Sequence, residues 1–185
     1  METMTVAERM TAQEFLVLPE RRWAQLIDGE LVISQPGLLH DGAAKEIDYA
    51  LQTWARAEPA RGRVCGPLDV QLEEGHVYAP DVLWYRDGRV PDRHDPPPYP
   101  IPDLAVEVRS PSTWRYDIGV KKSTYERHGL PELWLVDTAA DEVLVFRRSK
   151  PSSPTFDVAE ELAGSDTLTS PLLPGFALRL DAVFS

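Results

Sequence analysis

Two acidic residues stand in segments where apolar residues are expected. Asp81 lies in the run Ala79–Trp84, and Glu107 lies in the run Leu104–Val108. An ionised carboxylate inside a sheet is costly unless it is paired, hydrogen-bonded or bound to a cation. Two such acids on neighbouring strands could share a hard cation such as Mg²⁺, whose carboxylate and water ligands suit phosphate chemistry. The alternative is that each acid caps a strand end or pairs with an arginine, and spacing alone does not decide between the two.

Three further polar residues are spaced by four. Asp117, Lys121 and Tyr125 would stack along one face of a helix predicted from about Asp117 to His128. Asp117 before Lys121 is also the favourable order for an ordinary helical ion pair. Beside two metal-bound carboxylates, the Lys121 ammonium could instead stabilise charge developing on a phosphate or orient the attacking water.

Other catalytic motifs receive little support. The four histidines show no paired zinc-ligand spacing, and His40, just before the second predicted helix, could be a cap or a site residue. The chain has no Gly-x-Ser-x-Gly elbow, no P-loop and no Gly-x-Gly-x-x-Gly motif. Serine hydrolase, nucleotide kinase and dinucleotide-binding functions therefore lose their usual support.

The first third of the chain predicts a helix, a hairpin and a second helix. The Thr11–Glu14 segment fits a capping box that would open a short helix ending at Leu18. Asp28-Gly29 between the apolar runs 23–27 and 30–34 predicts a β-hairpin, because both turn positions favour positive φ. Apolar residues at helical spacing predict a helix from about Asp41 to Glu58.

The rest of the chain predicts mostly strands. The runs 64–72 and 77–85 would form a hairpin, 104–108 a strand buried on both faces, 133–136 and 143–146 a strand pair, 156–160 an edge strand, and 168–184 a tail wrapping the core. A mixed sheet with helices on its faces, of the α/β (α+β) class, accounts for this order of elements.

Composition limits the class of protein. With 185 residues the chain is expected to be one domain, 1–185, with its core at about 11–184. The net charge of −11 would repel nucleic acid over most of the surface, which excludes a nonspecific DNA coat protein. A single cysteine excludes an intrachain disulfide, and Met1 to Glu8 lack a secretory signal, so a cytoplasmic protein without a membrane segment is expected. Sheet edges that need covering suggest a homodimer.

Seven segments, in order along nearly the whole chain, resemble the Uma-two family of bacterial restriction endonuclease-like proteins, within the PD-(D/E)xK nuclease superfamily. They are LIDGEL (26–31), PDV (80–82), PDLAVEV (102–108), SPST (110–113), DIGVK (117–121), GLPELWLVD (129–137) and LTSPLLPG (168–175). The resemblance implies a restriction-endonuclease-like mixed sheet flanked by helices, with an N-terminal helix and hairpin. It also implies Mg²⁺- or Mn²⁺-dependent hydrolysis of nucleic acid phosphodiesters, with DNA favoured as the substrate.

The resemblance implies roles for individual residues. Asp81 and Glu107 match the two metal-binding acids and are expected to be catalytic together with Lys121. The superfamily's lysine position, two residues after Glu107, is Arg109 here, and the family's lysine matches Lys121 on the following helix. We predict that Lys121 is the functional cation and that Arg109 clamps the Glu107 carboxylate, since residues two apart on a strand share a face.

The surroundings of these residues leave two functions open. His40, Gln25, Arg109, Asp117 and Tyr125 are expected around the catalytic residues. Related sequences usually carry an acid where this chain has Gln25, which can hold a metal-bound water but brings no charge to a cation. The rival to a metal-dependent endonuclease is a catalytically inactive nuclease-fold protein that acts as a protein-interaction or regulatory module; Gln25 and the net charge favour it, and the intact Asp81, Glu107 and Lys121 favour the enzyme.

Overall fold

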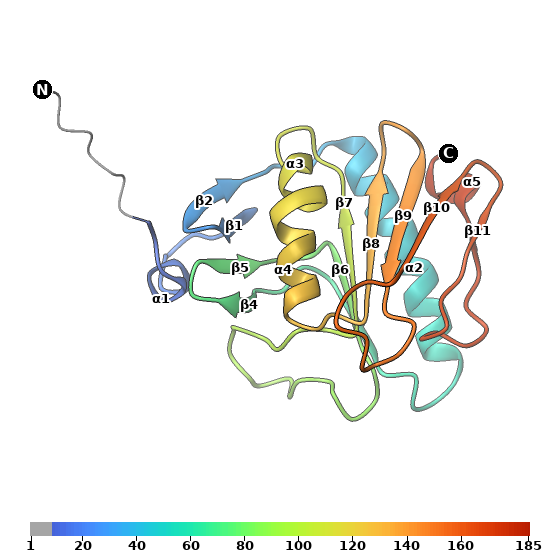
Figure 1. Ribbon diagram of the computed structural model, residues 1–185, viewed down its shortest axis with the longest axis horizontal. Helices are drawn as coiled ribbons and strands as arrows, with labels where there is room; N and C mark the ends of the chain where they lie inside the picture. The colour runs from blue at the N-terminus through green and yellow to red at the C-terminus, as the bar shows by residue number, and fades with distance from the viewer. Residues whose placement is uncertain (1–8) are drawn as a thin grey trace, which may run out of the picture.

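Two main β-sheets and the helices packed on them form the molecule, which a computed structural model describes over residues 9–185 (Figure 1). The predicted class, a mixed sheet flanked by helices, is confirmed. Residues 1–8, on which the expected lack of an export signal depends and with which the predicted domain 1–185 begins, lie outside the described residues. No helix within 9–185 has the length and apolar character needed to cross a bilayer.

The larger sheet has six strands. In spatial order they are β10 (Val158–Ala163), β9 (Glu142–Arg147), β8 (Glu132–Asp137), β7 (Leu104–Val108), β6 (Val82–Tyr85) and β3 (Arg63–Cys65). Only β7 and β8 pair in parallel, because the chain between them crosses over through helical segments; the other pairs are antiparallel. The predicted strand near 156–160 is confirmed as an edge strand, β10.

The smaller sheet has four antiparallel strands and lies beside the first (Figure 1). Its order is β2 (Glu30–Ile33), β1 (Ala24–Ile27), β5 (His76–Tyr78) and β4 (Val70–Glu73). A short pair, β11 (Thr167–Leu168) and β12 (Leu178–Arg179), closes the C-terminal tail. The Asp28-Gly29 hairpin is confirmed, with both residues at positive φ.

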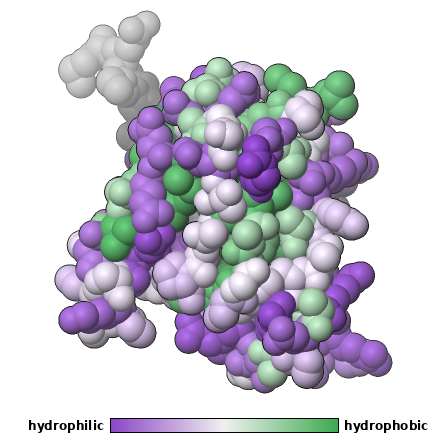
Figure 2. Space-filling view, turned by 90° about the vertical axis from the view of Figure 1, so that its right-hand side faces the viewer, coloured by the Kyte–Doolittle hydropathy of each residue, from purple (hydrophilic) through white to green (hydrophobic). Residues whose placement is uncertain are grey.

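Helices lie on both faces of the larger sheet, and one short helix packs on the smaller sheet. The helix on the smaller sheet is α1 (Ala12–Leu16). The others are α2 (Leu38–Ala57), α3 (Trp114–Tyr116), the π-helix η1 (Asp117–Lys121), α4 (Lys122–Arg127) and α5 (Leu180–Val183). On one face, Ile47 and Leu51 of α2 pack with Val106 of β7; on the other, Tyr125 of α4 packs with Ala105 of the same strand. The face toward β10, β11 and α5 is mostly hydrophilic, with hydrophobic residues in separate patches (Figure 2).

Several predicted boundaries are wrong. The predicted strands 64–72 and 77–85 are each broken, because Gly66-Pro67 and Pro80 interrupt the ladders. The second helix begins at Leu38, so His40 lies within it and not before it. The helix predicted from Asp117 starts earlier, at Trp114, and contains a π-helical turn.

Candidate active site

Asp81 and Glu107 face the same cavity. Val82 pairs with Val106 in the antiparallel ladder, so one residue further Asp81 stands opposite Glu107, and opposite residues share a face of the sheet. Both side chains line a cavity of about 350 Å³. The Asp81 side chain is 19% exposed and that of Glu107 only 4% exposed. The two acids that the sequence singled out therefore converge at the junction of the two sheets.

Glu107 is held by two residues of the helical segment that follows β7. The Lys121 Nζ lies 2.6 Å from Glu107 Oε2, and the Tyr125 hydroxyl donates a 2.7 Å hydrogen bond to Glu107 Oε1. Lys121 also lies 2.9 Å from Asp117 Oδ1. The structure thus brings together four of the predicted residues. Lys121 is 1% exposed and is not among the residues lining the cavity, so its ammonium lies behind the carboxylates.

The π-helix η1 places Asp117 and Lys121. The backbone N–H of Lys122 bonds to the carbonyl of Asp117, the wider spacing of a π-helical turn. Asp117 and Lys121 are the buried residues of this turn, whereas Ile118 between them is exposed. Turns of this type occur mostly as single insertions in α-helices, often at functional sites.

Burial and charge shift the pKa values of Glu107, Asp117 and Lys121. Burial raises the pKa of Glu107 to about 7; Lys121 opposes the shift, and the Asp117 and Asp81 carboxylates reinforce it. Burial likewise raises the pKa of Asp117 against the opposing effect of Lys121. For Lys121, burial favours the neutral amine, but the Asp117 and Glu107 carboxylates outweigh it and raise the pKa. The site therefore holds more carboxylates than the single buried ammonium of Lys121 can neutralise.

Asp81 is held by its own hydrogen bonds. The backbone N–H of Val108 donates to Asp81 Oδ2 at 2.7 Å, and His40 Nε2 lies 3.2 Å from Asp81 Oδ1. Burial alone would lower the pKa of His40, but the hydrogen bond to Asp81 and nearby carboxylates raise it. Gln25 also lines the cavity, with its Oε1 accepting a 3.1 Å hydrogen bond from the backbone N–H of Ala79. His40 therefore lies beside Asp81, and Gln25 lines the same cavity.

The predicted clamp of Arg109 on Glu107 is wrong. The Arg109 guanidinium binds Asp137 at the end of the neighbouring strand β8, with Nη1 at 2.8 and 2.9 Å from the two carboxylate oxygens, and lies over the Trp114 ring. Arg109 follows the last residue of β7, next to Asp137 at the end of the parallel strand β8, whereas Glu107 is already paired with Lys121. Arg109 is absent from the cavity lining.

The cavity has a second wall that sequence patterns did not predict. Arg21, Arg22 and Trp23, directly before β1, line it together with Ser34 and Ser110. The two serine hydroxyl oxygens lie 2.5 Å apart, which ties the hairpin to the end of β7. The paired arginines before the Asp-Gly hairpin were the feature of the sequence that could have indicated this wall, but nothing in the sequence places them near Asp81.

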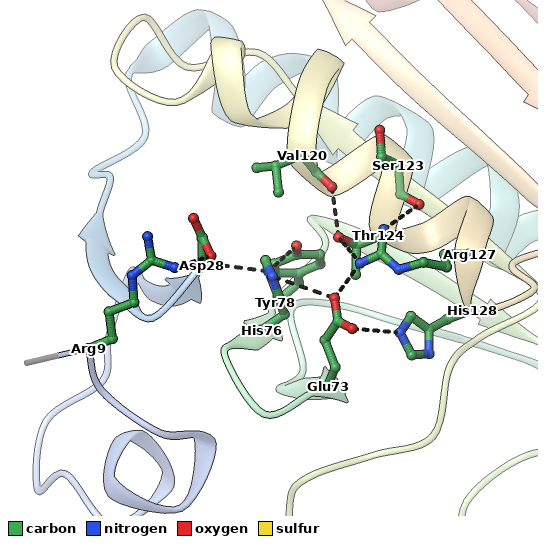
Figure 3. A network of polar contacts seen from close by, with 10 residues as sticks. All are labelled: Arg9, Asp28, Glu73, His76, Tyr78, Val120, Ser123, Thr124, Arg127 and His128. Carbon is green, nitrogen blue, oxygen red and sulfur yellow. Dashed lines mark hydrogen bonds and ion pairs between the residues drawn. The ribbon is translucent and has the colours of Figure 1, made fainter.

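A polar network supports the helical segment from the side of the smaller sheet (Figure 3). Glu73 of β4 binds Arg127 of α4, which joins this strand to the helix. The Tyr78 hydroxyl lies 2.6 Å from His76 Nδ1, and the Tyr78 ring packs edge-on against Tyr125, 5.3 Å between centroids. The network therefore fixes the aromatic ring whose hydroxyl holds Glu107.

The donor set fits a hard divalent cation. Asp81 and Glu107 are the carboxylates that could hold it, and each of their oxygens, with one contact apiece, keeps a second lone pair. Within residues 9–185 no group of three or more His, Cys, Asp or Glu side chains is arranged around one metal position. Two carboxylates suit Mg²⁺, which keeps several waters and commonly takes only one or two protein carboxylates.

The mixed sheet flanked by helices, with two acids and a helical lysine at one end, has the restriction-endonuclease-like arrangement expected from the sequence. The chain belongs to the Uma2 family, described as "Putative restriction endonuclease", whose model matches residues 12–181, and this confirms the resemblance. Its fold is similar to that of a protein from Anabaena variabilis described as "a putative nuclease belonging to DUF820", at 20% identity and a TM-score of 0.78, over 95% of this chain and 97% of that one. Among curated proteins, no sequence matches the chain.

Proposed function

We propose that this protein is a metal-dependent endonuclease that hydrolyses phosphodiester bonds of nucleic acid, with DNA as the expected substrate. The observation that carries the proposal is the convergence of Asp81 and Glu107 on one cavity in a chain of the Uma2 family. These two carboxylates would hold Mg²⁺ or Mn²⁺. When bound, the metal would supply an activated water and polarise the scissile phosphate.

Neighbouring residues orient the two carboxylates and favour the ionised form of Glu107. The Val108 backbone N–H fixes Asp81, and the Tyr125 hydroxyl fixes Glu107. The Lys121 ammonium favours the ionised form of Glu107, which burial otherwise disfavours. Because Lys121 lies behind Glu107, its present contacts position the carboxylate; contact with the substrate's phosphate would need the side chain to extend into the cavity.

The test is cleavage of supercoiled plasmid, single-stranded DNA and RNA with Mg²⁺ or Mn²⁺. We expect the wild type and Glu161→Gln, a change at an exposed site on β10, to cleave at the same rate, and Glu107→Gln to lose cleavage. Equal cleavage by the wild type and Glu107→Gln would point to a contaminating nuclease and contradict the proposal. Absence of cleavage with every metal would favour the alternative, an inactive nuclease fold used as an interaction or regulatory module. The presence of Gln25 in place of an acid supports that alternative.

A further inference from the structure

Trp23 is an exposed aromatic side chain at the wall of the candidate active site. The residue is 42% exposed, yet it lines the same cavity as Asp81 and Glu107. Indole and other aromatic rings in such positions serve proteins that bind single-stranded nucleic acid, because every base has a face that can stack. Trp23 therefore offers a surface for a base at the wall of the cavity that the carboxylates line.

The backbone holds Trp23 in an uncommon conformation. Its φ is +62°, in the left-handed region that bulky residues rarely adopt. The Trp23 carbonyl accepts a 3.0 Å hydrogen bond from the backbone N–H of Ser34, so the closing end of the β1–β2 hairpin keeps the residue in place. Conformations of this kind are strained and persist where surrounding structure imposes them, often at ligand sites.

Positive charge accompanies the ring. The Arg22 guanidinium carbon lies 5.2 Å from the centre of the Trp23 ring, within cation–π range, and Arg21 and Arg22 both line the cavity. Arg21 is tied to Asp69 at 3.2 Å, whereas Arg22 is exposed. An indole has two faces, so one can contact Arg22 while the other receives a base. An arginine beside an aromatic platform matches the phosphate and base of one nucleotide.

The dimensions of the site favour an unpaired strand over a duplex. Glu107 is 4% exposed, in a cavity of about 350 Å³. Duplex DNA is stiff over about 150 base pairs, and enzymes that act at enclosed sites take single strands or pull a nucleotide out of the stack. A flexible single strand can place one phosphate at the carboxylates without bending a duplex or unstacking a base pair.

We propose that Trp23 and Arg22 form a stacking site for an unpaired base, so that the ligand of this cavity is single-stranded nucleic acid. The inference rests on the proposed function, because it takes nucleic acid as the ligand. It goes beyond that function in assigning a strand form and a residue for base binding.

The test is binding in EDTA at low salt, so that no cleavage occurs. Fluorescence anisotropy compares labelled single-stranded DNA and RNA, a blunt duplex, and a DNA strand of equal length built from abasic residues. We expect the wild type to bind the single strands more tightly than the duplex or the abasic strand. Trp23→Ala should weaken binding of the normal strand roughly 5- to 150-fold, the effect of losing one stacked base, and should bind normal and abasic strands alike.

Two variants control for other effects of the substitution. Trp23→Phe keeps an aromatic face and should retain most of the affinity. Tyr49→Ala removes another exposed aromatic side chain, 69% exposed on α2 and outside the cavity, and should bind as the wild type does. An unchanged preference for normal over abasic DNA in Trp23→Ala, or tighter binding of the duplex, would overturn the inference. Trp23-dependent binding without cleavage would support it even if the proposed nuclease activity failed.

Discussion

Replacing Glu107 by glutamine should change how the stability of the protein depends on pH. Glu107 is fully buried, and its pKa is raised from an ordinary value of 4.5 to about 7. Between these values the unfolded chain loses the Glu107 proton while the folded protein keeps it. The folded state then binds more protons, so the free energy of unfolding falls as pH rises through this interval.

The size of the effect follows from the shift. One pKa unit corresponds to about 1.4 kcal/mol, so the shift of Glu107 costs the folded protein about 3 kcal/mol above pH 7. Because the chain has a pI near 4.8, measurements are best made from pH 5.5 upward. About 2 kcal/mol of the loss falls between pH 5.5 and pH 8. Glutamine cannot ionise and should escape this loss.

Urea unfolding in EDTA at pH 5.5 and pH 8 measures the difference. Relative to the wild type, Glu107→Gln should gain about 2 kcal/mol in free energy of unfolding between the two pH values. Glu161→Gln, at an exposed position, should follow the wild type at both. Parallel pH profiles for the wild type and Glu107→Gln would refute the reasoning, since they would mean that Lys121 compensates the Glu107 charge completely.

Three other outcomes are expected at the site and at the sheet edges. Lys121→Met, which keeps the side-chain volume but removes the charge, should lower the cleavage rate about 10²- to 10³-fold at pH 7 and move the pH optimum of cleavage to a higher value. Arg109→Ala, which breaks the ion pair with Asp137, should cleave at nearly the wild-type rate. The reverse result would return the catalytic role to Arg109. Millimolar Mg²⁺ should raise the melting temperature of the wild type at pH 8 but not that of Asp81→Asn, and equal shifts would place the metal elsewhere. Sedimentation velocity at micromolar concentration should show a dimer, because β10 and β2 are sheet edges, and a monomer would contradict this.

Local patterns predicted the elements, and pairing between distant segments defined the site. The capping box of Thr11 and Glu14 and the Asp28-Gly29 turn depend on neighbouring residues, and the structure has both. Asp81 and Glu107 were found as acids in apolar runs, but their convergence depends on the register of β6 against β7. The place of Trp23 was unpredictable in the same way, since it depends on how the small sheet meets the large one.

Side-chain partners were harder to predict than elements. The two-residue spacing of Glu107 and Arg109 implied a shared face, yet the end of β7 and the nearby Asp137 gave the guanidinium a different partner. The four-residue spacing of Asp117 and Lys121 suggested an α-helix, and the pair forms within a π-helical turn instead. A charged side chain near a strand end can pair with any of several carboxylates, and only the three-dimensional arrangement shows which of them it contacts.

The π-helical turn also has a consequence for sequence length within the family. Such a turn is an α-helical turn with one additional residue, so deleting one residue between Asp117 and Lys121 would restore regular α-helical bonding. The two residues would then be three apart instead of four. Because residues three apart and four apart are both neighbours on a helix surface, the ammonium would still lie beside the Asp117 carboxylate. Relatives that are one residue shorter here should therefore have a regular helix and keep the lysine pair.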